Sequence, residues 1–161
     1  SRYAIKGSLL EQPWALVADR VEVVHAPSKS PRWSTVVGSG SIRGGWGSWR
    51  LTADTLEIDG DTTTLTGDPV LIVDTQFDPP EVILKGNRAV INSKSELLTL
   101  SGSAMVMRPT MDVRTNKPDG FIELSLPGSR SGEVRMSAVT QSMGGSNADR
   151  QRAAPDQLTH R

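Results

Sequence analysis

The chain contains no cysteine and few aromatic side chains, since only 4% of its 161 residues are Phe, Trp or Tyr. The lack of cysteine excludes disulfides, thiolate nucleophiles and zinc–thiolate sites. Histidine is nearly absent as well, because His25 and His160 are the only two and lie far apart in the sequence. We therefore expect no metal site and no cofactor. We also expect no catalytic residues, because the sequence contains no Gly-x-Ser-x-Gly nucleophile elbow and no arrangement of Ser, Asp or Glu residues around His25 that is typical of a hydrolase.

No charge of one sign dominates, because 18 Lys and Arg residues balance 18 Asp and Glu residues. A neutral chain has no long-range field that would attract a phosphate backbone, so we expect no nucleic-acid partner. The sequence also lacks an apolar run long enough to span a bilayer, and no export signal pattern begins at Ser1.

What the chain does contain is turn residues and alternating strands. It has 15 glycines and 10 prolines, and apolar residues alternate with polar ones far more often than they follow a helical period. This pattern predicts an all-β protein with a single domain over residues 1–139. Residues 140–161 are polar and show no apolar period, which predicts a flexible C-terminal tail.

An interrupted alternation recurs three times. In residues 51–58 apolar residues stand at 51 and 53, the pattern skips one place, and apolar residues return at 56 and 58. The same skip occurs at Ala18-Asp19 and at Gly86-Asn87, giving offsets of 35 and then 33 residues from copy to copy. A skip of one place reverses the faces of a strand, as a bulge or a strand corner does.

The last two copies each continue into a second strand. Residues 65–67 read Leu-Thr-Gly and residues 100–102 read Leu-Ser-Gly, each followed by further apolar residues. Turn-forming segments at 59–61 and 92–94 separate the paired strands. The sequence thus predicts a hairpin-like unit of about 35 residues that stacks on its neighbours and leaves unpaired strand edges at both ends.

These repeats resemble a known family. The segments at 15–23, 51–73 and 84–107 are similar to the OstA-like repeats of the periplasmic lipopolysaccharide-transport proteins of the LptA and LptC type. The resemblance implies an antiparallel β-jellyroll, folded like a taco around an apolar groove that shields the acyl chains of lipopolysaccharide or another acylated lipid. It also implies a periplasmic location and association with other OstA-like proteins, or with further copies, through strand edges. An LptA-like bridge and an LptC-like adaptor with an inner-membrane anchor upstream of Ser1 are both open.

Alternation predicts which residues face the interior. The expected groove lining is Leu16, Ala18, Val21, Val23, Leu51, Leu56, Ile58, Leu65, Val70, Ile72, Leu84, Ile91, Leu98, Leu100, Met105 and Met107. The same residues would equally fill a closed sandwich core. The methionines favour the groove slightly, because flexible thioethers adapt to variable apolar ligands.

Other features suggest competing functions. Asp19 and Asp54 repeat at one structural position, which favours a structural role at the skip over a catalytic pair. Trp46 and Trp49, set among glycines, are candidates for contact with a sugar or a partner, although a strand-start role is favoured.

The main hypothesis is a non-enzymatic lipid-transport or envelope-assembly protein. The alternative is a structural β-solenoid module of an envelope, fibre or tail assembly, with a filled core and no ligand.

Overall fold

The computed structural model describes residues 3–9, 12–25, 34–126, 134–137 and 139–143. These residues form thirteen strands and contain no helix, so the all-β prediction is confirmed. The strands are β1 (Tyr3–Leu9), β2 (Gln12–Ala18), β3 (Arg20–His25), β4 (Ser34–Trp46), β5 (Trp49–Asp59), β6 (Thr62–Asp74), β7 (Ile83–Asn92), β8 (Leu97–Ser101), β9 (Met105–Met107), β10 (Met111–Thr115), β11 (Phe121–Ser125), β12 (Val134–Ser137) and β13 (Val139–Met143).

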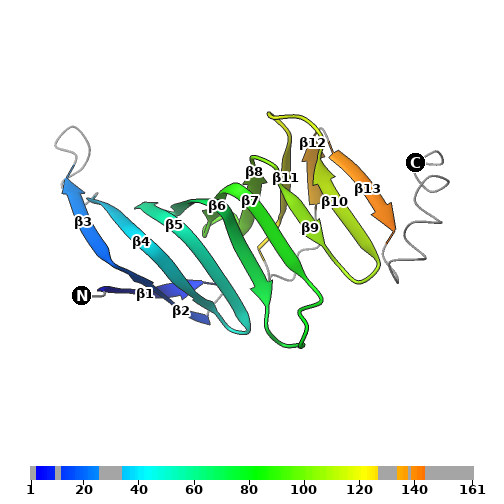
Figure 1. Cartoon of the computed structure of the whole chain (residues 1–161). Coiled ribbons are helices and arrows are strands. Elements are labelled where there is room, and N and C mark those ends of the chain that lie inside the picture. Colours follow the sequence, from blue (N-terminus) through cyan, green and yellow to red (C-terminus); the bar gives the residue numbers. More distant parts are fainter. Residues whose placement is uncertain (1–2, 10–11, 26–33, 127–133, 138, 144–161) are drawn as a thin grey trace.

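All strand pairings between described residues are antiparallel, as predicted. The main path through the sheet runs β1-β2-β4-β5-β6-β7-β8-β11-β12. Strands follow one another in chain order along one axis of the molecule, from the N-terminal to the C-terminal end (Figure 1). Strand β13 begins at Val139 and extends to Met143, which lies within the predicted tail of residues 140–161, and residues 144–161 lie outside the described residues.

The long strands β4 to β7 bend in the middle, and the bend divides the sheet into two halves. The first part of β4 pairs with β3 and its second part pairs with β2. We call one side the β1 half; it contains β1, β2, β9, β10, β13 and residues 42–46, 49–53, 70–74 and 83–86. The other side is the β3 half, with β3, β8, β11, β12 and residues 34–39, 55–59, 62–66 and 88–92.

The bend lies where the sequence skips one place. The register shifts between Thr52 and Thr55 on β5, which brackets the second skip, and between Thr66 and Val70 on β6. At the first skip the Asp19 amide donates to the Gly40 carbonyl at 3.1 Å, and at the third the Asn87 amide donates to the Gly102 carbonyl at 2.8 Å. Equivalent backbone hydrogen bonds therefore hold the corner at two copies of the repeat.

This corner requires glycine, because neighbouring side chains approach the backbone closely there. Gly40 and Gly102 have φ angles of +75° and +69°, where a Cβ atom is strained. A Cβ on Gly40 would lie 2.7 Å from the Asp19 carboxylate, and one on Gly102 would lie 2.8 Å from the Asn87 Cβ. Asp19 and Asp54 are both exposed at the corner.

The apolar core lies between the two halves. It contains twenty-one buried hydrophobic side chains among the described residues, from Leu16 in β2 to Leu126 just after β11. Leu65, Ile72, Leu98 and Leu100 are fully buried. Since these side chains come from both halves, their burial against one another keeps the folded sheet together.

Candidate functional site

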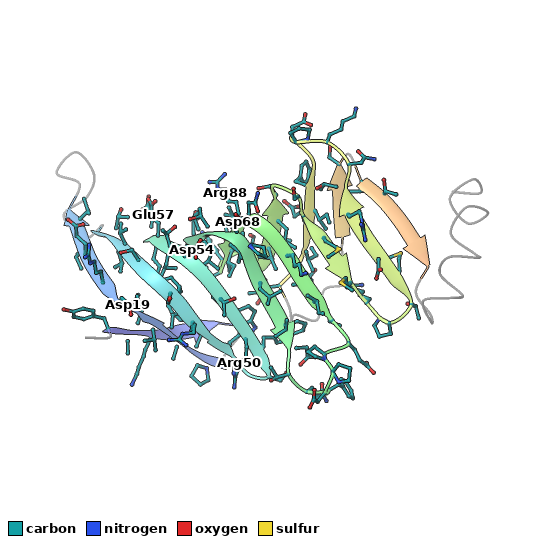
Figure 2. All side chains as sticks on the ribbon, viewed as in Figure 1. Asp19, Arg50, Asp54, Glu57, Asp68 and Arg88 are labelled. Carbon is teal, nitrogen blue, oxygen red and sulfur yellow. The ribbon has the colours of Figure 1, made fainter. Side chains whose placement is uncertain are left out.

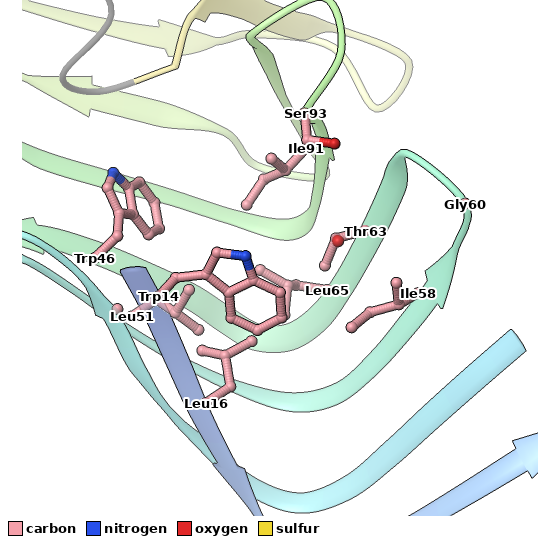
Figure 3. A pocket seen from close by; sticks show the side chains of 11 residues that line it. Trp14, Leu16, Trp46, Leu51, Ile58, Gly60, Thr63, Leu65, Ile91 and Ser93 are labelled. Atoms are coloured by element: carbon pink, nitrogen blue, oxygen red, sulfur yellow. The ribbon is translucent and has the colours of Figure 1, made fainter. Parts of the chain in front are cut away.

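An apolar cavity of about 220 Å³ opens between the two halves at the N-terminal end of the molecule. Its wall on one side comes from the β1 half and on the other side from the β3 half, as Figure 3 shows. The lining residues are Trp14, Leu16, Gly45, Trp46, Leu51, Ile58, Gly60, Thr63, Leu65, Ile91 and Ser93. None of them carries an ionisable side chain, so the cavity favours an apolar ligand.

Three tryptophans align across neighbouring strands of the β1 half. Trp14 of β2 lies opposite Trp46 of β4, and Trp46 lies opposite Trp49 of β5. Trp46 is only 2% exposed, whereas Trp14 and Trp49 are half-buried and pack against the core. Aromatic cross-strand neighbours stabilise an antiparallel pair. The row gives the β1 half a rigid aromatic wall, and two of its rings, Trp14 and Trp46, line the cavity.

The opposite wall consists of aliphatic residues of the β3 half. Ile58 and Leu65 face the cavity from β5 and β6, and Ile91 faces it from β7. The polar rim is formed by hairpin tips, where the Ser93 amide donates to the Asp61 carbonyl at 2.9 Å. This bond joins two adjacent turns, so the rim is fixed by backbone pairing.

Five of the predicted groove residues line this cavity, namely Leu16, Leu51, Ile58, Leu65 and Ile91. Seven others are buried in the core outside it: Ala18, Leu56, Val70, Ile72, Leu84, Leu98 and Leu100. Val21 is half-buried and packs against the core. The predicted interior therefore divides into a cavity wall at one end and closely packed core residues elsewhere.

Val23 does not lie inside, since it is 52% exposed. Its register with Val36, which in turn pairs with Ile58, places it on the inner side of the sheet. Among the described strands, however, β3 is the last of its half, and it pairs only with β4. Alternation predicted the correct side for Val23, but an edge strand has no further strand to cover it.

Met105 and Met107 are only half-buried, and Val106 between them is the buried residue of β9. Leu84 lies opposite Val106, while Lys85 and Ile83 lie opposite the two methionines. The prediction of Met105 and Met107 assumes that inward residues in the third repeat have the same spacing as in the second. After Leu65, the corner includes residues 67–69, and the next buried residue is Val70. After Leu100, the corner contains only Gly102 and Ser103 at positive φ, and Ala104 is already buried. One residue fewer reverses the faces.

Sequence reasoning missed Trp14, Thr63 and Ser93 as cavity residues. Trp14 stands two places before Leu16, and Thr63 stands two places before Leu65, so extending the alternation by one step would have found both. Trp46 and Trp49 are buried and half-buried. Trp46 therefore offers no exposed ring face on which a sugar could stack.

In the part of the chain that the structure describes, no three His, Asp or Glu residues come together in a way that could hold a metal ion. No helix there is long and apolar enough to cross a membrane.

Comparison with known proteins identifies the fold. No protein-family model and no curated protein sequence matches the chain. The structure, however, is similar to that of LptH from Pseudomonas aeruginosa, described as the LptA homologous periplasmic component of the conserved lipopolysaccharide transport device. The TM-score is 0.56 at 17% sequence identity, and the match covers 81% of this chain and 98% of LptH. The OstA-like resemblance of the repeats is thus confirmed at the level of the fold, and the chain has the β-jellyroll architecture of LptH.

Proposed function

We propose that this protein is a periplasmic component of lipopolysaccharide transport that shields acyl chains in the cavity between its two halves, without a chemical step. The observation that carries this proposal is an apolar, uncharged cavity enclosed by both halves of an LptH-like fold. Each methylene that leaves water for such a site contributes roughly 0.8 kcal/mol, so binding needs no charged group.

The size of the cavity limits what it holds. Its volume of about 220 Å³ is below the range of about 300–1,000 Å³ that is usual for drug-sized ligands. We infer that it takes a segment of an acyl chain rather than a whole lipid. Partial enclosure suits a carrier that must release its ligand.

The sheet edges supply the proposed contacts with partners. Among the strands that the structure describes, β1 pairs only with β2 and β3 pairs only with β4 at the N-terminal end, while β12 and β13 each have one neighbour at the other end. An open strand edge can hydrogen-bond to another strand. We propose that these edges join the chain to other OstA-like proteins or to further copies of itself.

A photo-crosslinking side chain at one of two adjacent positions tests the acyl-chain proposal. Thr63 lines the cavity, and Thr64 points to the outside of the same strand. In cells, Thr63 replaced by p-benzoylphenylalanine should label lipopolysaccharide or another acylated lipid, and the same replacement at Thr64 should not. Both variants should be checked for folding by circular dichroism.

Equal labelling at the two positions, or none at either in a folded protein, would contradict the carrier proposal. Absence of labelling together with ligand-free assembly at rising protein concentration would favour the structural β-solenoid alternative.

A further inference from the structure

The outer face of the β1 half is basic. Alternation turns one side chain in two away from the core, and five Lys or Arg residues lie on this face: Lys6, Arg43, Arg50, Lys85 and Arg114. Four of them are exposed, and Lys85 is half-buried. Asp112 is the single acidic residue among the described residues of this face, and it is only 5% exposed.

The outer face of the β3 half has the opposite character. Glu22, Glu57 and Glu123 lie in one cross-strand row, and Asp59 lies beside them in the next. Only Arg20 and Arg88 are basic among the side chains described there. Figure 2 shows Arg50 and Glu57 at opposite ends of β5, one on each half. The neutral net charge of the chain thus conceals two faces of opposite sign.

An apolar strip runs through the basic face. Leu71 lies between Thr52 and Lys85, and Met105 lies between Lys85 and Arg114. In the neighbouring row Val73, Ile83 and Met107 follow Arg50 in the same way. All five apolar side chains are half-buried. Apolar residues interleaved with long basic side chains form the combination that suits a membrane interface.

We propose that this face, defined by the five basic residues and the apolar strip, docks on the surface of an anionic phospholipid bilayer. Negative headgroups attract the Lys and Arg side chains, and the strip meets the boundary between headgroups and acyl chains. The acidic face of a second copy would match the charges. The apolar side chains of that face are separated by polar ones, however, since Val37 lies between Glu22 and Glu57, and Val90 lies between Thr64 and Thr99. That face therefore has no continuous apolar row to match Val73, Ile83 and Met107.

Vesicle co-sedimentation tests the proposal. The full chain should bind vesicles of phosphatidylglycerol and phosphatidylethanolamine, fail to bind pure phosphatidylcholine, and lose binding as salt rises. Each basic side chain near an anionic surface changes the binding constant by about fivefold. The double variant Arg43→Gln/Arg114→Gln should therefore bind about 25-fold more weakly.

The matched control removes the same two charges from the other face. Arg20→Gln/Arg88→Gln has the same net charge as the first variant, and both of its positions are exposed. It should bind anionic vesicles as well as the unaltered chain does, or better. Equal weakening by the two double variants would show a non-specific response to net charge and would overturn the proposal.

A gain of binding separates a docking face from a folding defect. Thr52 is exposed between Arg43 and Leu71, so Thr52→Lys should strengthen vesicle binding about fivefold. Two results overturn the proposal: no binding of the unaltered chain to anionic vesicles, or self-association without vesicles that Arg43→Gln/Arg114→Gln abolishes. The acyl-chain proposal rests on the interior cavity, and the Thr63 labelling experiment tests it separately.

Discussion

The two ends of the interior differ although the same alternating pattern builds both. At the N-terminal end Trp14, Ile58 and Thr63 stay half-buried around a cavity. At the C-terminal end Leu98, Leu100 and Ile122 are at most 1% exposed. The difference teaches that alternation decides which side chains face inward, whereas the separation of the two halves decides whether those side chains meet.

Backbone hydrogen bonds outside the strands tie the C-terminal end together. The Leu126 amide donates to the Glu96 carbonyl at 2.8 Å, which links the end of β11 to the turn before β8. The Thr115 amide donates to the Ala104 carbonyl at 2.9 Å, and the Ala104 amide donates to the Thr115 hydroxyl at 3.0 Å. These hydrogen bonds hold together the backbone segments whose inward side chains form the closely packed core at the C-terminal end.

The largest predicted effect concerns truncation of an inward side chain at each end. Leu98→Ala should lower the free energy of unfolding by about 3 kcal/mol, because it leaves a cavity in a closed core. Ile58→Ala should cost about 1 kcal/mol, since Ile58 already borders open space. Urea denaturation followed by circular dichroism measures both values.

Comparable losses at the two positions would remove the distinction between a packed end and an open end. The double variant offers a second check, since Leu98 and Ile58 lie on different strands and do not face each other in the register. Their two costs should add.

Much of this architecture could be predicted from the chain. The skips at Ala53-Asp54 and Gly86-Asn87 predicted a break in register, and the bend of the sheet occurs there. Leu51, Leu65 and Ile91 were placed inside because a strand exposes alternate side chains to one face. Such predictions succeed because they depend only on local geometry.

The failures depend on features that are not local. Val23 has the correct orientation but lies on an edge strand, and no sequence pattern states which strand is last. Met105 and Met107 were assigned by analogy with an earlier repeat whose corner is longer. The cavity itself depends on how far the halves separate, and the row of Trp14, Trp46 and Trp49 forms only through pairing of distant strands.

A smaller effect is expected from adding one methyl group at a glycine. Gly102→Ala should cost about 2 kcal/mol, because the residue has a φ of +69° and its Cβ would lie 2.8 Å from the Asn87 Cβ. Gly38→Ala should leave stability within about 0.5 kcal/mol or raise it. Its φ is not in the left-handed region, and its nearest neighbours, Ala18 Cβ and Ile42 Cδ1, would both lie at 3.4 Å.

Thermal unfolding of the two variants measures how much one added methyl group changes the stability at each position. If Gly38→Ala proved as costly as Gly102→Ala, the inner face near β3 would be as tightly packed as the corner in the C-terminal part.

The smallest predicted change fills the open end. Thr63→Leu adds apolar surface to the cavity wall and should raise the free energy of unfolding by up to about 0.8 kcal/mol. Thr64→Leu, on the outer side of the same strand, should give no such gain.

If the cavity holds acyl chains, Thr63→Leu should also reduce lipid labelling from a photo-crosslinker at Ile58, and Thr64→Leu should leave it unchanged. Stabilisation with undiminished labelling would mean that lipid approaches Ile58 from outside the cavity. The packed C-terminal end offers no equivalent gain, because its inward leucines leave almost no surface exposed. If the cavity binds acyl chains as proposed, stability and binding oppose each other at the N-terminal end, where open space is kept at the expense of core packing.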